Sequence, residues 1–157
     1  MIATASPSKV LMNENGKKAA PPDWSRWAAL CARVTLGAAF LSGIADRFGL
    51  YRGRNVGYGN FSGFVRYTAK VNSFMPPSTI PFLAWAATIA ELFFGIALIL
   101  GIWRVWVALG SAVLLILFGT AMAISFGIKS PLDYSVFSAS SAALLVAAYE
   151  GRCKERK

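Results

Sequence analysis

One acidic residue, Glu91, lies near the middle of a long apolar segment, residues 81–103. A carboxylic acid that is shielded from water can hold a proton near neutral pH and exchange it with a bound molecule. A basic residue, Arg33, lies in a second apolar segment, residues 27–45. With a helical rise of about 1.5 Å per residue, the two residues differ in depth by about 9 Å, so their side chains can meet if the helices touch. The predicted chemistry is proton exchange at Glu91, tuned by Arg33.

Both residues also have a purely structural interpretation. Arg33 lies close enough to one end of its segment for the side chain to extend to the lipid headgroups. Glu91 can be a neutral acid that hydrogen-bonds a hydroxyl or backbone carbonyl of a neighbouring helix and only holds the helices together. These alternatives remain open at the level of the sequence.

The elements that position these residues are apolar segments long enough to cross a bilayer, which takes about 20 residues. The predicted spans are residues 27–45, 81–103, 105–128 and the shorter 134–149. A hydrophobic content of 56% is more than a soluble chain of 157 residues can hide in its interior. The predicted fold class is therefore all-α, a four-helix transmembrane bundle formed by residues 24–150.

The connection between the first two spans is the only one long enough to form further structure. Phe61, Phe64, Val65 and Thr68 recur at helical spacing, which predicts a short interfacial helix within residues 60–74. The alternative is a partly ordered loop whose aromatic side chains lie at headgroup level. Residues 1–23 are polar and predict a disordered tail, and residues 151–157 form a basic tail.

The basic residues predict an orientation in the membrane. Four spans place nine Lys and Arg residues on the side of the termini and six on the other: Lys9, Lys17, Lys18, Arg26, Arg104, Arg152, Lys154, Arg156 and Lys157 against Arg47, Arg52, Arg54, Arg66, Lys70 and Lys129. This bias favours a multi-pass protein of the cell inner (plasma) membrane with both termini in the cytoplasm. The net charge of +9 is then explained by orientation and by attraction to membrane lipids, and no nucleic-acid motif accompanies it.

Asp46 and Arg47 follow the first span, and Asp133 precedes the fourth. They can form a second polar cluster near the outer surface. The interpretation we favour from the sequence is that they are solvated charges at helix ends.

Missing residue types narrow the chemistry. The chain has no His, the usual axial ligand of haem b and the commonest metal ligand, so we expect neither haem nor a metal. Its two cysteines, Cys31 and Cys153, are too far apart in sequence to form a CxxC redox motif. Reactive chemistry therefore requires a lipid-soluble cofactor or another subunit.

Several motifs together resemble the DoxX/DoxD family of small four-span membrane proteins, and the shorter DoxX branch in particular. They are RVTLGAAFLSG at 33–43, GNFSGFVRYTAKVN at 59–72, the Ala90-Glu91-Leu92 triplet followed by Gly95 and by 98–101, and KSPLDYSVF at 129–137. The likeness covers roughly residues 25–150. An Arg in the first span, a Glu in the second and SPLDYSVF before the fourth occur in the expected order.

The resemblance implies a membrane subunit of a quinone-linked oxidoreductase, with thiosulfate or a related sulfur compound as electron donor. Within that role, the hypothesis drawn from the residues themselves makes Glu91 and Arg33 catalytic and places Trp85 and Phe94 beside a quinone ring. Arg52, Arg54 and Arg66, with Asp133 and Tyr134, are the candidates for binding the substrate. The implied partners are other subunits of a redox complex or further copies of the chain. The alternative is a non-enzymatic scaffold or small-solute transporter in which Arg33 and Glu91 form a tie or gate.

Overall fold

The structure is a computed structural model that describes residues 23–51, 53 and 56–155. Six α-helices and one short 3-10 turn make up its regular structure, and the described residues contain no strand. The elements are α1 (Asp23–Arg47), α2 (Phe61–Val71), η1 (Pro77–Thr79), α3 (Ile80–Leu100), α4 (Arg104–Phe126), α5 (Lys129–Asp133) and α6 (Val136–Glu155).

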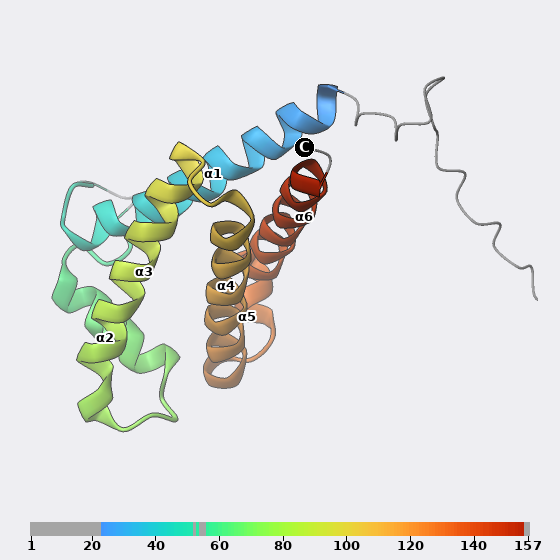
Figure 1. Cartoon of the computed structure of the whole chain (residues 1–157). Coiled ribbons are helices and arrows are strands. Elements are labelled where there is room, and N and C mark those ends of the chain that lie inside the picture. The colour runs from blue at the N-terminus through green and yellow to red at the C-terminus, as the bar shows by residue number, and fades with distance from the viewer. Residues whose placement is uncertain (1–22, 52, 54–55, 156–157) are drawn as a thin grey trace, which may run out of the picture.

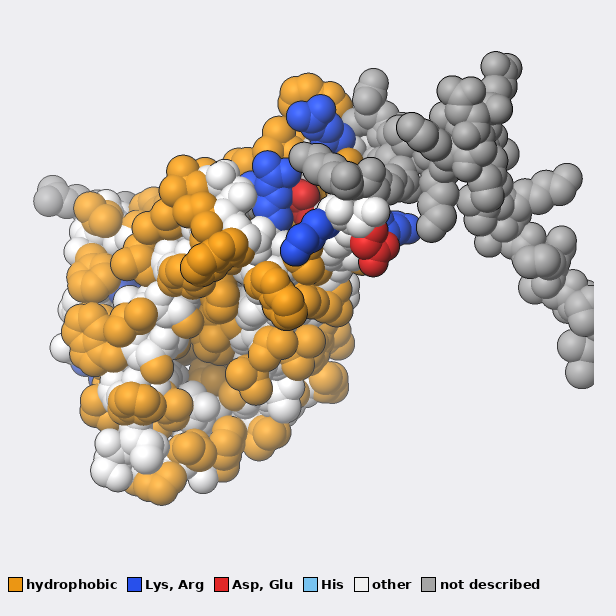
Figure 2. All heavy atoms as spheres, in the orientation of Figure 1, with side chains coloured by type: hydrophobic (Ala, Val, Ile, Leu, Met, Phe, Trp, Pro, Cys, Tyr) orange, Lys and Arg blue, Asp and Glu red, His pale blue; other side chains and the backbone are white. Residues whose placement is uncertain are grey.

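Three of these helices are long and apolar enough to cross a membrane: Trp24–Arg47, Pro77–Leu100 and Arg104–Phe126. They confirm that the predicted spans 27–45, 81–103 and 105–128 are apolar helices. The second ends earlier than predicted, at Leu100, because Gly101 adopts a left-handed conformation (φ 73°) and starts a tight turn. Figure 2 shows hydrophobic side chains over most of the visible face, as expected for helices in contact with lipid.

The fourth predicted span differs most from the structure. A separate short helix, α5, occupies residues 129–133, and α6 starts at Val136 and continues to Glu155, well into the predicted basic tail. Because its last two turns carry Glu150, Arg152 and Lys154, α6 is not among the helices that qualify as membrane spans. The apolar part, residues 136–149, is about 21 Å long, which is shorter than the hydrocarbon layer of about 30 Å.

The helices surround a core formed mainly by α1, α3, α4 and α6. In Figure 1 the chain runs up along α3, down along α4 and up again along α6, while α1 crosses these helices at a steep angle. The buried residues Leu36, Phe40, Leu98, Val107 and Ala143 form the main core cluster. One end of the molecule thus contains the start of α1, the turn between α3 and α4, and the end of α6.

The crossing of α1 and α3 depends on two glycines. A Cβ atom on Gly37 would lie 2.8 Å from the carbonyl oxygen of Gly95, and one on Gly95 would lie 3.3 Å from the carbonyl oxygen of Gly37. The two backbones are therefore close enough to exclude a side chain at this point. This contact sets the register of α1 on α3, and with it the pairing of their polar residues.

A helix forms within the predicted stretch 60–74, as α2. Asn60 caps its N-terminus by accepting a hydrogen bond from the backbone N–H of Gly63 (2.8 Å). Phe64, Thr68 and Val71 are buried, whereas Arg66 and Lys70 are exposed. The hydroxyl of Ser125 on α4 donates to the carbonyl of Val71 (2.6 Å), which joins α2 to the end of α4.

Candidate functional site

The most deeply buried ion pair joins Glu91 in α3 to Arg47, the last residue of α1. Nη2 of Arg47 donates to both carboxylate oxygens of Glu91, at 2.7 and 2.8 Å, and Nη1 donates to the hydroxyl of Thr88 at 3.0 Å. Arg47 is 4% exposed and Glu91 is 3% exposed. Helical side chains lean toward the N-terminus, so an arginine at the end of α1 extends back along its own helix to reach α3.

Aromatic rings of the following segment cover this pair. The guanidinium carbon of Arg47 lies 3.6 Å from the ring centre of Phe64 and 5.9 Å from that of Tyr58. Cations are attracted to aromatic faces, most strongly where water is excluded. The charge of Arg47 is therefore held between a carboxylate and two rings.

Asp46 holds the connecting segment against the end of α1. Its Oδ2 accepts hydrogen bonds from the backbone N–H groups of Gly57 (3.0 Å) and Tyr58 (2.8 Å), which fixes Tyr58 beside Arg47. Two buried polar atoms of this cluster, Oδ1 of Asp46 and Nε of Arg47, have no hydrogen-bond partner among the described residues.

A small pocket of about 250 Å³ adjoins the cluster and is referred to as the tyrosine pocket. Its lining consists of Gly57, Tyr58, Gly63, Arg66, Tyr67 and Lys70. The rings of Tyr58 and Tyr67 are 5.3 Å apart. None of the described residues that line the pocket is acidic, so it presents hydrogen-bond donors and positive charge.

Burial changes the acid–base behaviour of both tyrosines. Burial and then the neighbouring Tyr67 raise the pKa of Tyr58 from 10.0 to about 12, although the charge of Arg47 acts in the opposite direction. Burial and then Tyr134 raise the pKa of Tyr67. Both hydroxyls therefore stay protonated, and able to donate a hydrogen bond, throughout the neutral pH range.

A second charged cluster forms around Arg33, near the middle of α1 (Asp23–Arg47). Arg33 donates through Nε and Nη2 to the carbonyl of Leu98 (3.1 and 2.9 Å) and through Nη1 to Glu150 (3.3 Å). Glu150 also pairs with Arg104 at 3.4 Å. Arg33 therefore joins α1 to both α3 and α6, and it is only 6% exposed.

The structure corrects two interpretations drawn from the sequence. Arg33 and Glu91 do not pair with each other, because the Gly37–Gly95 contact places Arg33 beside Leu98 and brings Arg47 to Glu91. The interpretation of Asp46 and Arg47 as solvated end charges was wrong, since they are 8% and 4% exposed. The signal that sequence reasoning missed is the position of Arg47 only two residues beyond the apolar segment 27–45, from which its long side chain can reach inward.

The remaining site candidates are dispersed. Trp85 is 49% exposed and contacts the ring of Phe61 of α2 at a tilt (ring centres 4.4 Å apart), whereas Phe94 packs into the core beside α4. The two therefore do not flank a common space. Asp133 is exposed and pairs with Lys129. Of the predicted substrate residues, Arg66 lines the tyrosine pocket and Tyr134 lies near Tyr67. Arg52 and Arg54 lie outside the described residues.

Metal coordination has no candidate in the part of the chain that the structure describes. No group of three or more His, Cys, Asp or Glu side chains converges there. Cys31 and Cys153, on α1 and α6, are both free thiols.

Comparison with known proteins adds the family to these observations. The DoxX family model matches residues 28–124, which is more than half of the chain. This region contains Arg33, Arg47, Glu91 and the tyrosine pocket, but not Glu150. No curated protein and no solved structure matched the chain. The apolar helices and the matched region together show that this chain is a membrane protein that belongs to the DoxX family.

Proposed function

We propose that the chain is a membrane subunit of a quinone-linked oxidoreductase complex and that the tyrosine pocket binds the ligand. The observation that supports this proposal is the surplus of hydrogen-bond donors and positive charge in the pocket. Tyr58, Tyr67, Arg66 and Lys70 can all donate hydrogen bonds, and the described lining contains no carboxylate. Quinone carbonyls and small oxyanions such as thiosulfate are acceptors, so both fit this set of donors.

The size of the pocket limits what it can hold. Its volume of about 250 Å³ is below the range of about 300–1,000 Å³ that is typical of small-molecule sites. A quinone headgroup or a small oxyanion is therefore the appropriate ligand, and an isoprenoid tail must lie outside. A bound quinone would take up two electrons and two protons to become the quinol, with the electrons supplied by a sulfur compound through a partner subunit.

The residues of this chain would orient the ligand and stabilise charge. Tyr58 donates a hydrogen bond to an acceptor atom, and the positive charge of Arg47 behind its ring favours negative charge that develops on the ligand. Glu91 holds Arg47 in position through both of its oxygens. Because both oxygens are occupied, Glu91 could exchange a proton with a ligand only after Arg47 had moved away. We therefore propose that the main role of Glu91 is to position Arg47.

A second candidate function is a non-enzymatic scaffold or transporter in which Arg47 and Glu91 form a tie between helices. The full engagement of both Glu91 oxygens by Arg47 favours this candidate. Arg33, near the middle of α1, and Glu150 would be a second tie.

The proposal includes four spans, with α6 as the fourth and both termini in the cytoplasm of a bacterial or archaeal cell. α6 packs along α4, and the apolar part of a short helix can be accommodated by local thinning of the bilayer. In this arrangement α2 lies at the outer surface, with Arg66 and Lys70 toward the headgroups and Phe64 toward the core.

The decisive experiment measures thiosulfate-dependent reduction of a ubiquinone analogue by the complex extracted gently from its own host with its partners retained. Tyr58→Phe removes one hydroxyl at nearly constant volume, so we expect activity to fall about tenfold, the value of one hydrogen bond to a charged or polarised group. Tyr51→Phe is the matched control, because Tyr51 is exposed and bonds only Ser42 among the described residues. Glu91→Gln tests the positioning role in parallel.

Activity in the wild type that survives Tyr51→Phe and is lost in a folded Tyr58→Phe variant supports the quinone function. Full activity of Tyr58→Phe overturns the assignment of the pocket. No activity in any form, with partner subunits confirmed by mass spectrometry, moves the conclusion to the scaffold.

A further inference from the structure

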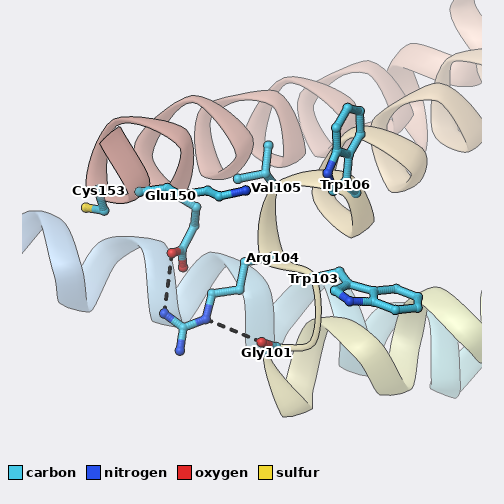
Figure 3. A pocket seen from close by; sticks show the side chains of 8 residues that line it. Gly101, Trp103, Arg104, Val105, Trp106, Glu150 and Cys153 are labelled. Carbon is cyan, nitrogen blue, oxygen red and sulfur yellow. Dashed lines mark hydrogen bonds and ion pairs between the residues drawn. The ribbon is translucent and has the colours of Figure 1, made fainter. Parts of the chain in front are cut away.

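A larger cavity lies at the opposite end of the bundle from the tyrosine pocket. Its volume is about 580 Å³, and it opens between the turn that joins α3 to α4 and the last turns of α6 (Figure 3). The lining residues are Gly101, Trp103, Arg104, Val105, Trp106, Glu150, Cys153 and Lys154. We refer to it as the α4–α6 cavity.

The charges around this cavity are predominantly positive. Glu150 is the only acidic residue among those that line it, and it is already shared between the buried Arg33 and the half-exposed Arg104. Lys154 is exposed and makes no hydrogen bond or ion pair with the other described residues. Three cations, Arg33, Arg104 and Lys154, face the single carboxylate of Glu150, which leaves an excess of two positive charges.

Tryptophans gather at this end of the molecule. Trp24 and Trp27 lie near the start of α1, Trp103 and Trp106 lie at the start of α4, and their exposed fractions are between 66% and 72%. Exposed tryptophans at the ends of apolar helices mark the boundary between hydrocarbon and headgroups. Figure 2 shows charged side chains collected at the same end. The cavity therefore lies at the depth of the lipid phosphates.

The backbone adds donors to the same cavity. α4 begins here without a side chain that caps its first N–H groups, and Trp103, Arg104, Val105 and Trp106 all face the cavity. The unpaired N–H groups of a first helical turn favour an anion. These N–H groups add to the positive charge that Arg104 and Lys154 give to the cavity.

We propose that the α4–α6 cavity binds the phosphate headgroup of an anionic phospholipid. Arg104 and Lys154 contact the phosphate, Trp103 and Trp106 lie beside the glycerol region, and the acyl chains extend over exposed apolar residues such as Leu100 and Ile102. This site goes beyond the proposed function and does not depend on it, because none of its residues lines the tyrosine pocket.

The test uses the full chain, delipidated in a neutral detergent and titrated with short-chain phosphatidylglycerol while native mass spectrometry records occupancy. The variant is the double substitution Arg104→Gln with Lys154→Gln. At about 1 kcal/mol per basic residue near a membrane surface, we expect its affinity for phosphatidylglycerol to fall about thirtyfold. Arg26→Gln with Arg152→Gln is the matched control, since it removes two exposed charges from the same end without touching the cavity lining.

A second measurement reports on the cavity directly. Cys153 lines it, so in a Cys31→Ser background bound lipid should slow the alkylation of Cys153 by a water-soluble maleimide. Phosphatidylcholine and inorganic phosphate are the comparison ligands in both measurements.

Preferential binding of phosphatidylglycerol that is weakened by the cavity variant and retained by the control supports the site. Equal weakening in both variants shows general surface attraction and overturns it. Complete competition by inorganic phosphate overturns the lipid as the ligand, and binding of phosphatidylcholine with the same affinity overturns recognition of anionic charge.

Discussion

Arg47 and Glu91 are 44 residues apart in the chain, yet one nitrogen of the arginine donates hydrogen bonds to both carboxylate oxygens. Phe64 covers the guanidinium face at 3.6 Å, and Thr88 accepts from the second terminal nitrogen. Each charge is therefore satisfied only while α1, α2 and α3 are in place together. This dependence makes the pair the most informative position for mutagenesis.

Breaking the pair from one side should be strongly destabilising. Arg47→Met or Glu91→Gln leaves the partner buried without its counter-charge or its full set of hydrogen bonds, which costs about 3–5 kcal/mol. The double variant Arg47→Met with Glu91→Met removes both charges and should recover most of the lost stability. Denaturant unfolding of the purified protein in detergent measures all three. Additive losses in the double variant would show that the two side chains are not energetically coupled.

The crossing of α1 and α3 yields a prediction with an internal control. Gly37→Ala places a methyl group 2.8 Å from a backbone carbonyl oxygen, which cannot move without separating the helices, so we expect a loss of about 1–3 kcal/mol. Gly151→Ala in α6 meets nothing within 4 Å and should stabilise the helix by about 0.5–1 kcal/mol. Thermal unfolding of both variants compares them, and a neutral Gly37→Ala would contradict the tight crossing.

Tyr58 gives the protein a specific pH dependence. Its pKa is raised from 10.0 to about 12 in the folded state, so the folded protein binds its phenolic proton more tightly than the unfolded chain does. The stabilisation is complete below pH 10 and is lost as the pH rises from 10 toward 12. In an alkaline titration followed by tyrosinate absorbance, the Tyr58→Phe variant should lack the component that titrates at the highest pH in the wild type. Loss of a component that titrates near pH 10 would place Tyr58 in water.

The sides of the membrane on which the two termini lie distinguish four spans from three. If α6 crosses the membrane, reporters fused to the two ends of the chain face the same compartment; if only α1, α3 and α4 cross, they face opposite compartments. Protease protection of tags in intact cells and in inverted vesicles measures this directly. We expect both tags to be accessible only from the cytoplasmic side.

The sequence predicted the helices much better than the contacts between them. Hydrophobicity alone located α1, α3 and α4, because a run of about 20 apolar residues has few other structures available to it in a membrane. The partners of Arg33 and Glu91 were not predictable from depth, since the depth estimate assumed parallel helices and α1 crosses the others steeply (Figure 1). Glu150 was missed as a partner for a related reason, because α6 continues beyond the apolar run and carries its carboxylate back to α1.

The tyrosine pocket was predictable only in part. Arg66 was a candidate from its charge, whereas Tyr58 and Tyr67 were not singled out as site residues, although Tyr67 lies in the 59–72 motif. Their position depends on two backbone hydrogen bonds to Asp46 and on the packing of Phe64 over Arg47. Such long-range pairings leave no periodicity in the sequence that could reveal them.

The link between Arg33 and Glu150 also bears on how the chain is made. The two residues are 117 positions apart, so at about 5–20 residues per second the carboxylate is synthesised on the order of 6–23 seconds after the arginine that it neutralises. During that interval α1 carries a cation whose acidic partner does not yet exist, and lipid phosphates or the insertion machinery must accommodate it. The first helix can settle into its final position only when the last one arrives, so a chain that stops before residue 150 should insert its early helices without completing the bundle.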